Sequence, residues 1–142
     1  MNKIISHIIV PTDKGIILIR RTKKERGKVN VFPHWWDIPG GLSESEELPK
    51  DAAIRECKEE IGLDVTINKI IGEDSNFDNL KKTVYTRLVY LANEVDIEDE
   101  QEIQLNITEH DKIFFLDSLK HLKKDVNIVP YVSDAISKVL TQ

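Results

Sequence analysis

The stretch "GGLSESEELPKDAAIRECKEEIGL", residues 40–63, combines a glycine pair with a charged run that has the composition of a helix. Pro49 suits a first helical turn, strong helix formers follow it, and Gly62 suits the residue that ends a helix. These features predict a helix over residues 49–61. Leu48, just before it, has no side-chain oxygen to cap the helix, which weakens the helix start by about 1 kcal/mol.

The predicted helix carries an apolar stripe and an adjacent acidic stripe. With about 3.6 residues per turn, the apolar stripe holds Ala53, Ile54, Cys57 and Ile61, and the acidic stripe holds Glu56, Glu59 and Glu60. Like charges one turn apart destabilise a helix, so a bound cation is the expected compensation. The alternative for an isolated pattern of this kind is a solvated helix face.

Length and composition favour a single domain over residues 1–142 with a small-molecule partner. Lys plus Arg number 20 against 25 Asp plus Glu, a formal net charge of -5, which argues against a nucleic-acid or membrane partner. Cys57 is the single cysteine, and no signal peptide or membrane-spanning run is recognisable in the sequence. We therefore expect a cytoplasmic protein, either a monomer or a homodimer.

The rest of the chain reads as short strands and a second helix. The sequence predicts a hairpin of two strands at 3–10 and 15–21, then a loop leading to a short strand at 36–38. Two further strands are expected within 64–73 and 82–94, separated by a turn at 74–79, with a last strand at 112–117 and a helix within 129–142. This order predicts a mixed α/β domain in which helices cover a curved or mixed sheet.

Three glutamates on one helical face are suited to hard divalent cations. Mg²⁺ is usually held by a few carboxylates, waters and substrate phosphates, and such ions activate water against a pyrophosphate. A spare glutamate would accept the proton of that water. Because the carboxylates titrate as a coupled group, the spacing does not select the base.

The charged and glycine positions of residues 41–63 resemble the Nudix box, G-x5-E-x7-R-E-U-x-E-E-x-G-U, in which U is a bulky aliphatic residue. The matching residues are Gly41, Glu47, Arg55, Glu56, Glu59, Glu60, Gly62 and Leu63, while the first U is Cys57. The resemblance implies a Nudix hydrolase, an α/β/α sandwich that cleaves nucleoside diphosphate derivatives with Mg²⁺ or, alternatively, Mn²⁺.

The resemblance also implies roles for individual residues. Glu56, Glu59 and Glu60 correspond to metal ligands, and either Glu56 or Glu59 to the base. Arg55 and Glu47 correspond to the pair that orients them. The backbone carbonyl of the glycine turn at Gly40 would also face the metal. Beyond the box, Glu109 is the candidate for a further metal ligand, with a solvated loop charge as the alternative.

Substrate contacts are expected from residues outside the box. Arg20 and Arg21 are candidates for phosphate binding, with ordinary surface pairing as the alternative. Phe32 or Trp35 is a candidate for stacking on a base, against the commoner fate of core packing, which we expect for Trp36.

Three further polar residues, Asn127, His34 and His110, lie outside the box. Asn127 suits the recognition of a purine edge, as in relatives of the MutT type, but equally a turn or helix cap. His34 and His110 lack partner spacing for zinc and receive no metal role.

Elimination favours a nucleoside triphosphate as the substrate. The segment after the box lacks the features associated with ADP-ribose and NADH enzymes, and the coenzyme A signature is only loosely matched. We therefore expect a MutT-like pyrophosphohydrolase. The alternatives are an enzyme acting on a dinucleotide or a coenzyme A-type substrate, and a nucleotide-binding regulatory domain without activity.

Overall fold

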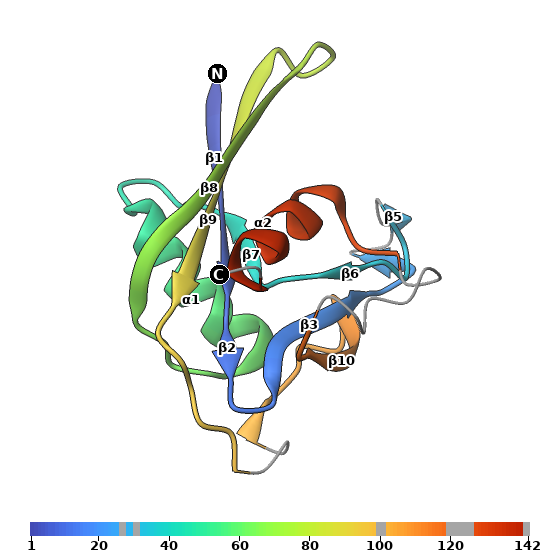
Figure 1. Ribbon diagram of the computed structural model, residues 1–142. Coiled ribbons are helices and arrows are strands. Elements are labelled where there is room, and N and C mark those ends of the chain that lie inside the picture. The colour runs from blue at the N-terminus through green and yellow to red at the C-terminus, as the bar shows by residue number, and fades with distance from the viewer. Residues whose placement is uncertain (26–27, 30–31, 99–101, 119–126, 141–142) are drawn as a thin grey trace.

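The computed structural model describes residues 1–142 except 26–27, 30–31, 99–101, 119–126 and 141–142 (Figure 1). Within the described residues the chain forms two four-stranded sheets, a two-stranded ribbon and two helices. The ribbon, β4 (Lys24–Glu25) with β5 (Lys28–Val29), lies in the segment that the sequence predicted to be a loop.

The first sheet is mixed and has the strand order β7-β1-β9-β8. Its strands are β1 (Asn2–Ile9), β7 (Gly40–Leu42), β8 (Ile67–Asp78) and β9 (Thr83–Ala92). β1 runs parallel to β9 and antiparallel to β7, so the glycine pair is hydrogen-bonded to the first strand of the chain.

The second sheet is antiparallel and is built around β3 (Gly15–Arg21). β3 pairs with β10 (His110–Leu116), with β2 (Pro11–Thr12) and with β6 (Trp36–Asp37), the short strand predicted at 36–38. The register places His110 opposite Arg21 and Asp37 opposite Ile19. These pairings bring residues from distant parts of the sequence to one end of β3.

The predicted hairpin of residues 3–10 with 15–21 is wrong. The turn after β2 is present, but only β2 folds back on β3, whereas β1 pairs with β7 and β9 in the other sheet. Residues 6–10 and 16–19 are buried throughout. Each run therefore needs cover on both faces, which two central strands in separate sheets receive and a lone hairpin does not.

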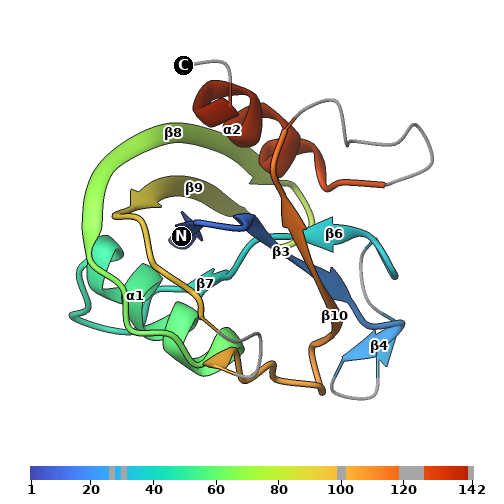
Figure 2. The same ribbon diagram turned by 60° about the horizontal axis from the view of Figure 1, so that its bottom comes forward.

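The helices α1 (Pro49–Ile61) and α2 (Pro130–Leu140) lie on opposite sides of the sheets (Figure 2). This arrangement confirms the predicted mixed α/β architecture, and α1 has the predicted bounds. The molecule has two apolar cores, and alternate residues of the central strands point into one or the other. Ile8 and Ile17 pack in the core that contains Cys57 of α1, whereas Ile9 and Ile16 pack in the core that contains α2.

The hairpin of β8 and β9 extends away from the rest of the molecule (Figure 1). Its strands are paired from Ile67 opposite Ala92 to Asp78 opposite Thr83. The turn predicted at 74–79 is therefore wrong by several residues, because 74–78 continue the strand. Leu80 at the tip is 95% exposed.

The two described helices, α1 and α2, are short. Neither of them is both long enough and apolar enough to cross a bilayer.

Candidate active site

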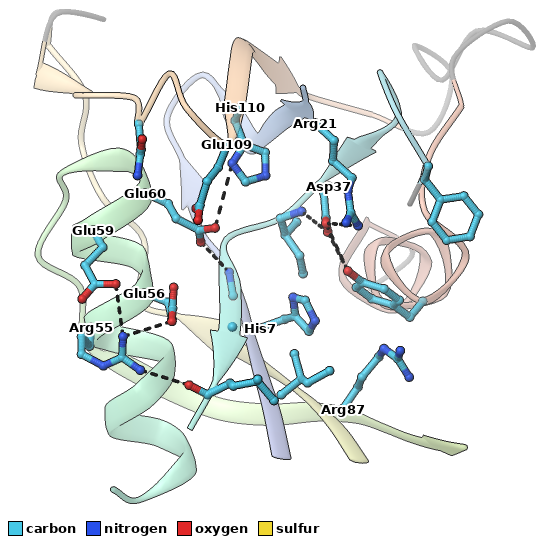
Figure 3. Close-up of a pocket in the computed structure, with 18 of the residues that line it drawn as sticks. His7, Arg21, Asp37, Arg55, Glu56, Glu59, Glu60, Arg87, Glu109 and His110 are labelled. Atoms are coloured by element: carbon cyan, nitrogen blue, oxygen red, sulfur yellow. Dashed lines mark hydrogen bonds and ion pairs between the residues drawn. The ribbon is translucent and has the colours of Figure 1, made fainter. Parts of the chain in front are cut away.

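A pocket of about 980 Å³ opens between α1, the glycine turn and the ends of β3 and β10. Acidic side chains from α1 line one side, and Arg21 and Asp37 lie on the other (Figure 3). The two sides differ in sequence origin: α1 and β7 are neighbours in the chain, whereas the other side collects residues from five separate segments.

Arg55 organises the acidic stripe through its guanidinium group. Its Nε and Nη2 donate to the two oxygens of Glu47 at 2.8 and 3.0 Å. Nη1 donates to Glu56 Oε1 at 3.0 Å and to Glu59 Oε2 at 3.1 Å, and Nη2 also donates to the Leu42 carbonyl at 3.1 Å. A planar group thus holds three carboxylates in fixed orientations.

Glu60 is the buried member of the stripe, with 4% of its surface exposed. Its Oε2 accepts a hydrogen bond from the Gly40 amide at 2.7 Å. Burial raises the pKa of Glu60 well above its ordinary value, the Gly40 amide opposes this, and the charges of Glu56 and Glu109 add to it. A folded chain therefore holds this carboxylate in a place that disfavours its charge unless a cation is near.

Glu56 shows the same conflict in weaker form. Burial raises the pKa of this carboxyl, Arg55 opposes the shift, and the charges of Glu59 and Glu47 add to it. Glu59 is more open to solvent, with 54% of its side chain exposed. Glu47, outside the pocket lining, has a pKa lowered to about 2 chiefly by the hydrogen bonds from Arg55.

The glycine pair is required by close approach. A Cβ on Gly41 would overlap the carboxylate of Glu56, and one on Gly40 would overlap the ring of His7 and lie 2.6 Å from the Ser6 carbonyl oxygen. Gly40 therefore allows the close approach of β7 to β1, and Gly41 allows the close approach of β7 to the Glu56 carboxylate of the acidic stripe.

The opposite side of the pocket contains a buried polar cluster around Asp37. Its Oδ1 accepts from the Ile38 amide at 2.7 Å and from the Tyr131 hydroxyl at 3.0 Å, and its Oδ2 accepts from Arg21 Nη1 at 3.3 Å. Burial raises the pKa of Asp37, while Arg21 and the amide lower it. β3, β6 and α2 meet at this one carboxylate.

Tyr131 lies between two nitrogen-containing side chains. The His7 ring centroid is 4.5 Å from the Tyr131 ring, and the Arg87 guanidinium carbon is 5.4 Å from its centroid. Burial, followed by the charge of Arg87, lowers the pKa of His7 to about 3, so its imidazole is neutral at pH 7. An aromatic ring under a cation makes this side suited to the planar and anionic parts of a ligand.

His110 lies between the two sides of the pocket. Its Nδ1 is 3.9 Å from Glu60 Oε1, and burial lowers its pKa to about 4, so this contact is not an ion pair at pH 7. The ligand atoms of Glu60, Glu109 and His110 all lie within 4.8 Å of one another. We predicted no metal role for His110 from the sequence because it lacks the partner spacing of a zinc site, and Glu60 is 50 positions away in the chain.

The structure brings most of the sequence-predicted site residues to the pocket. Arg55, Glu56, Glu59, Glu60, Gly40, Glu109, Arg21 and Phe32 line it, and Glu47 reaches it through Arg55.

Three predicted residues lie elsewhere. Arg20 forms a bidentate pair with Asp111 at 2.8 and 3.0 Å. Trp35 is partly buried in the α2 core, with its ring centroid 4.7 Å from that of Phe32. Asn127 is exposed, and its backbone carbonyl accepts from the Trp36 amide at 2.8 Å.

Sequence reasoning missed Asp37, Tyr131, His7, Arg87 and His110. Asp37 gave a signal, because a carboxylate next to the glycine turn in a short apolar strand is unusual. The others gave none, because they reach the pocket only through long-range contacts: the pairing of β1 with β9, the pairing of β10 with β3 and the docking of α2.

The donor set fits a hard divalent cation. Carboxylates of Glu56, Glu59, Glu60 and Glu109 line one side of the pocket, and their oxygens are the ligands that Mg²⁺ prefers. The raised pKa values of Glu56 and Glu60 show that the fold assembles this negative charge against its own electrostatic cost. The Glu56 carboxylate occupies the space that a side chain at position 41 would need, so Gly41 keeps this carboxylate in the pocket.

Known proteins share parts of this sequence. Diphosphoinositol polyphosphate phosphohydrolase 2 of Mus musculus is 34% identical over 76 residues, which are 54% of this chain and 40% of that protein. The 8-oxo-dGTP diphosphatase of Proteus vulgaris is 53% identical over 32 residues, 22% of this chain and 29% of that protein. The matches thus span less than half the length of these relatives.

The fold comparison extends over the whole chain. The crystal structure of the MutT NUDIX hydrolase from Burkholderia pseudomallei superposes with a TM-score of 0.76, covering 98% of each chain at 20% identity. The family profile described as the NUDIX domain matches residues 2–132. Since this match takes in the glycine turn, the acidic helix and both sheets, the chain belongs to the Nudix hydrolase family.

Proposed function

We propose that this protein is a metal-dependent pyrophosphohydrolase that converts a nucleoside triphosphate to a nucleoside monophosphate and pyrophosphate. One observation carries the proposal: the acidic stripe of α1 and the cluster of Arg21, Arg87 and Tyr131 line the same pocket. The phosphate chain of a nucleotide would lie between the acidic stripe with its metal and the two arginines. The planar base would lie against Tyr131.

On the acidic side, Glu56, Glu59, Glu60 and Glu109 would hold Mg²⁺ or Mn²⁺, together with the Gly40 carbonyl. When bound, such an ion neutralises the phosphates and lowers the pKa of an attacking water. Arg55 fixes one oxygen each of Glu56 and Glu59, which leaves their other oxygens directed to other partners. Either glutamate then serves as the base that accepts the water proton.

On the opposite side, Arg21 and Arg87 supply the positive charge that faces the phosphates. Phe32, about half-buried in the pocket lining, and Tyr131 supply aromatic surface for the base. Both arginines are already oriented, Arg21 by Asp37 and Arg87 by Asn76 Oδ1 at 2.7 Å. Little side-chain ordering would be needed on binding.

The names of the two relatives described above suggest two substrate classes, and the charge distribution of the pocket supports one of them over the other. A diphosphoinositol polyphosphate carries phosphates around its whole ring and needs cations on several sides. In the described part of the chain, the pocket lining has three arginines, and Arg55 among them is committed to carboxylates. A nucleoside triphosphate, the kind of substrate named for the Proteus vulgaris enzyme, fits this distribution of charge better.

The test is incubation of the purified protein with Mg²⁺ and a panel of nucleoside triphosphates, dinucleotides, nucleotide sugars, ADP-ribose and diphosphoinositol polyphosphate. We expect nucleoside monophosphate and pyrophosphate, identified by ³¹P NMR, and no products after chelation of the metal. Turnover of another compound class alone would overturn the choice of substrate.

No turnover of any compound would overturn the enzymatic function. Binding measured by calorimetry, with the ligand recovered unchanged, would then indicate the regulatory alternative.

A further inference from the structure

We propose that His110 Nδ1 joins Glu60 and Glu109 as a metal ligand, so that this protein has a mixed nitrogen and oxygen site that selects Mn²⁺ over Mg²⁺. The inference rests on the proposed function, because it assumes that a divalent ion occupies the acidic side of the pocket. It adds a ligand from β10, outside the helix that supplies the carboxylates.

The distances among the three side chains fit one ion. The Nδ1 atom of His110 lies 3.9 Å from Glu60 Oε1, and all three ligand atoms lie within 4.8 Å of one another. Metal–ligand bonds of about 2.1 Å place neighbouring ligands about 3 Å apart and opposite ones about 4.2 Å apart. The contact is too long for a hydrogen bond and has the separation of two ligands across an ion.

The fold gives the two oxygens of Glu60 different surroundings. Oε2 accepts the Gly40 amide at 2.7 Å, which leaves Oε1 directed toward His110 (Figure 3). The β10 register holds the imidazole in place, since His110 pairs with Arg21 at the end of β3. Helix, turn and strand thus aim two ligand atoms at one position.

The His110 nitrogen has no other use within the described residues. The residue is 6% exposed, and Nδ1 is buried without a hydrogen-bond partner there. A buried imidazole nitrogen without a partner is unfavourable, and a bound ion would remove this cost. A buried polar atom of this kind calls for a partner, and an ion shared with Glu60 Oε1 would supply one.

The chemistry of imidazole determines which ion is favoured. Mg²⁺ strongly prefers an all-oxygen shell, whereas first-row transition metals accept imidazole nitrogen readily. Replacing His110 with asparagine offers an oxygen or amide at nearly the position of Nδ1. Selectivity for Mn²⁺ therefore depends on this one atom.

The experiment measures metal binding by the full chain after chelation. Free Mn²⁺ is followed by electron paramagnetic resonance, and Mg²⁺ by its competition with Mn²⁺. We expect His110→Asn to weaken Mn²⁺ binding roughly tenfold and to change Mg²⁺ binding less than about twofold. His34→Gln, at an exposed histidine outside the pocket, is the matched control and should change neither.

A second measurement uses the unaltered chain. Pulsed resonance of bound Mn²⁺ should show a directly coordinated nitrogen whose signal changes when histidine alone is labelled with ¹⁵N and disappears in His110→Asn. Metal binding without this signal, or equal effects of the variant on both ions, would overturn the inference and leave the proposed function standing. Absence of any metal binding would overturn both.

Discussion

Arg55 and Gly40 hold the acidic stripe by different means. Arg55 forms ion pairs with Glu47, Glu56 and Glu59, whereas Glu60, within the described residues, accepts a hydrogen bond from the Gly40 amide and makes no ion pair with Arg55. Charge compensation within the apo chain is therefore incomplete at Glu60. This difference predicts opposite effects of two conservative substitutions.

Glu60→Gln should weaken metal binding and turnover while preserving the fold. The glutamine oxygen can still accept the Gly40 amide, but a charged ligand is lost, so we expect metal affinity to fall by roughly 10- to 100-fold. The apo-protein should melt at or above the wild-type temperature, because a buried repulsive charge is removed. Calorimetry of the metal-free and metal-loaded forms measures both quantities.

The control for this substitution is Asp51→Asn, at an exposed residue of the same helix outside the pocket. A Glu60→Gln protein that melted earlier than wild type with its Mg²⁺ dependence intact would show that Glu60 is structural.

Glu47→Gln should instead destabilise the fold in a pH-dependent way. The folded chain keeps Glu47 ionised down to about pH 2, whereas its ordinary pKa is 4.5, so the unfolded chain binds more protons between these values. The pair with Arg55 thus stabilises the native state fully above pH 4.5, and this contribution is lost as the pH falls toward 2. Urea midpoints at pH 7, 4.5 and 3 should show a shrinking difference from wild type.

Glu46→Gln, at the exposed neighbouring residue, serves as the comparison for Glu47→Gln. A deficit of Glu47→Gln that stayed constant across this pH range would argue that packing, and not charge, holds Glu47.

The element α1 begins without a side-chain cap. Leu48 occupies the capping position in extended geometry, is 58% exposed and makes no side-chain hydrogen bond to the first turn. Leu48→Ser should supply an acceptor and raise the free energy of unfolding by about 0.5–1 kcal/mol. Leu48→Ala, which lacks the oxygen, should not. Chemical denaturation of both variants distinguishes a cap from the removal of an exposed apolar side chain.

At the scale of elements, the sequence predicted what is local. Pro49, Gly62 and the apolar stripe of α1 interact within a few residues, so its bounds and its pair of Glu47 with Arg55 were predictable. The partner of β1 was not, because the parallel pairing with β9 joins residues about 80 positions apart and depends on burial of both faces. The place of His110 and Tyr131 in the pocket was not predictable either, because their neighbours there are distant in the sequence.

At the scale of the molecule, Asp37 connects the sheets to α2. Tyr131→Phe removes the hydroxyl that donates to Asp37 and leaves a buried carboxylate with fewer donors, so we expect a loss of about 1–2 kcal/mol in unfolding free energy. Tyr85→Phe in β9 is the control, since no described hydrogen bond involves its hydroxyl. Urea unfolding measures the difference, with the same dependence of the unfolding free energy on urea concentration used for all variants. Equal stability of both variants would show that α2 docks by apolar contacts alone.

The two sides of the pocket have unequal origins along the chain. Residues 40–60 supply the glycine turn, Arg55 and three carboxylates, whereas His7, Arg21, Asp37, Arg87 and Tyr131 come from five separate strands and helices. Apart from Glu109 and His110, the proposed metal-binding groups are consequently encoded in one short stretch of the gene, separate from the residues proposed for recognition. A short cassette can be exchanged to alter catalytic power, whereas altering ligand choice requires coordinated changes at scattered codons.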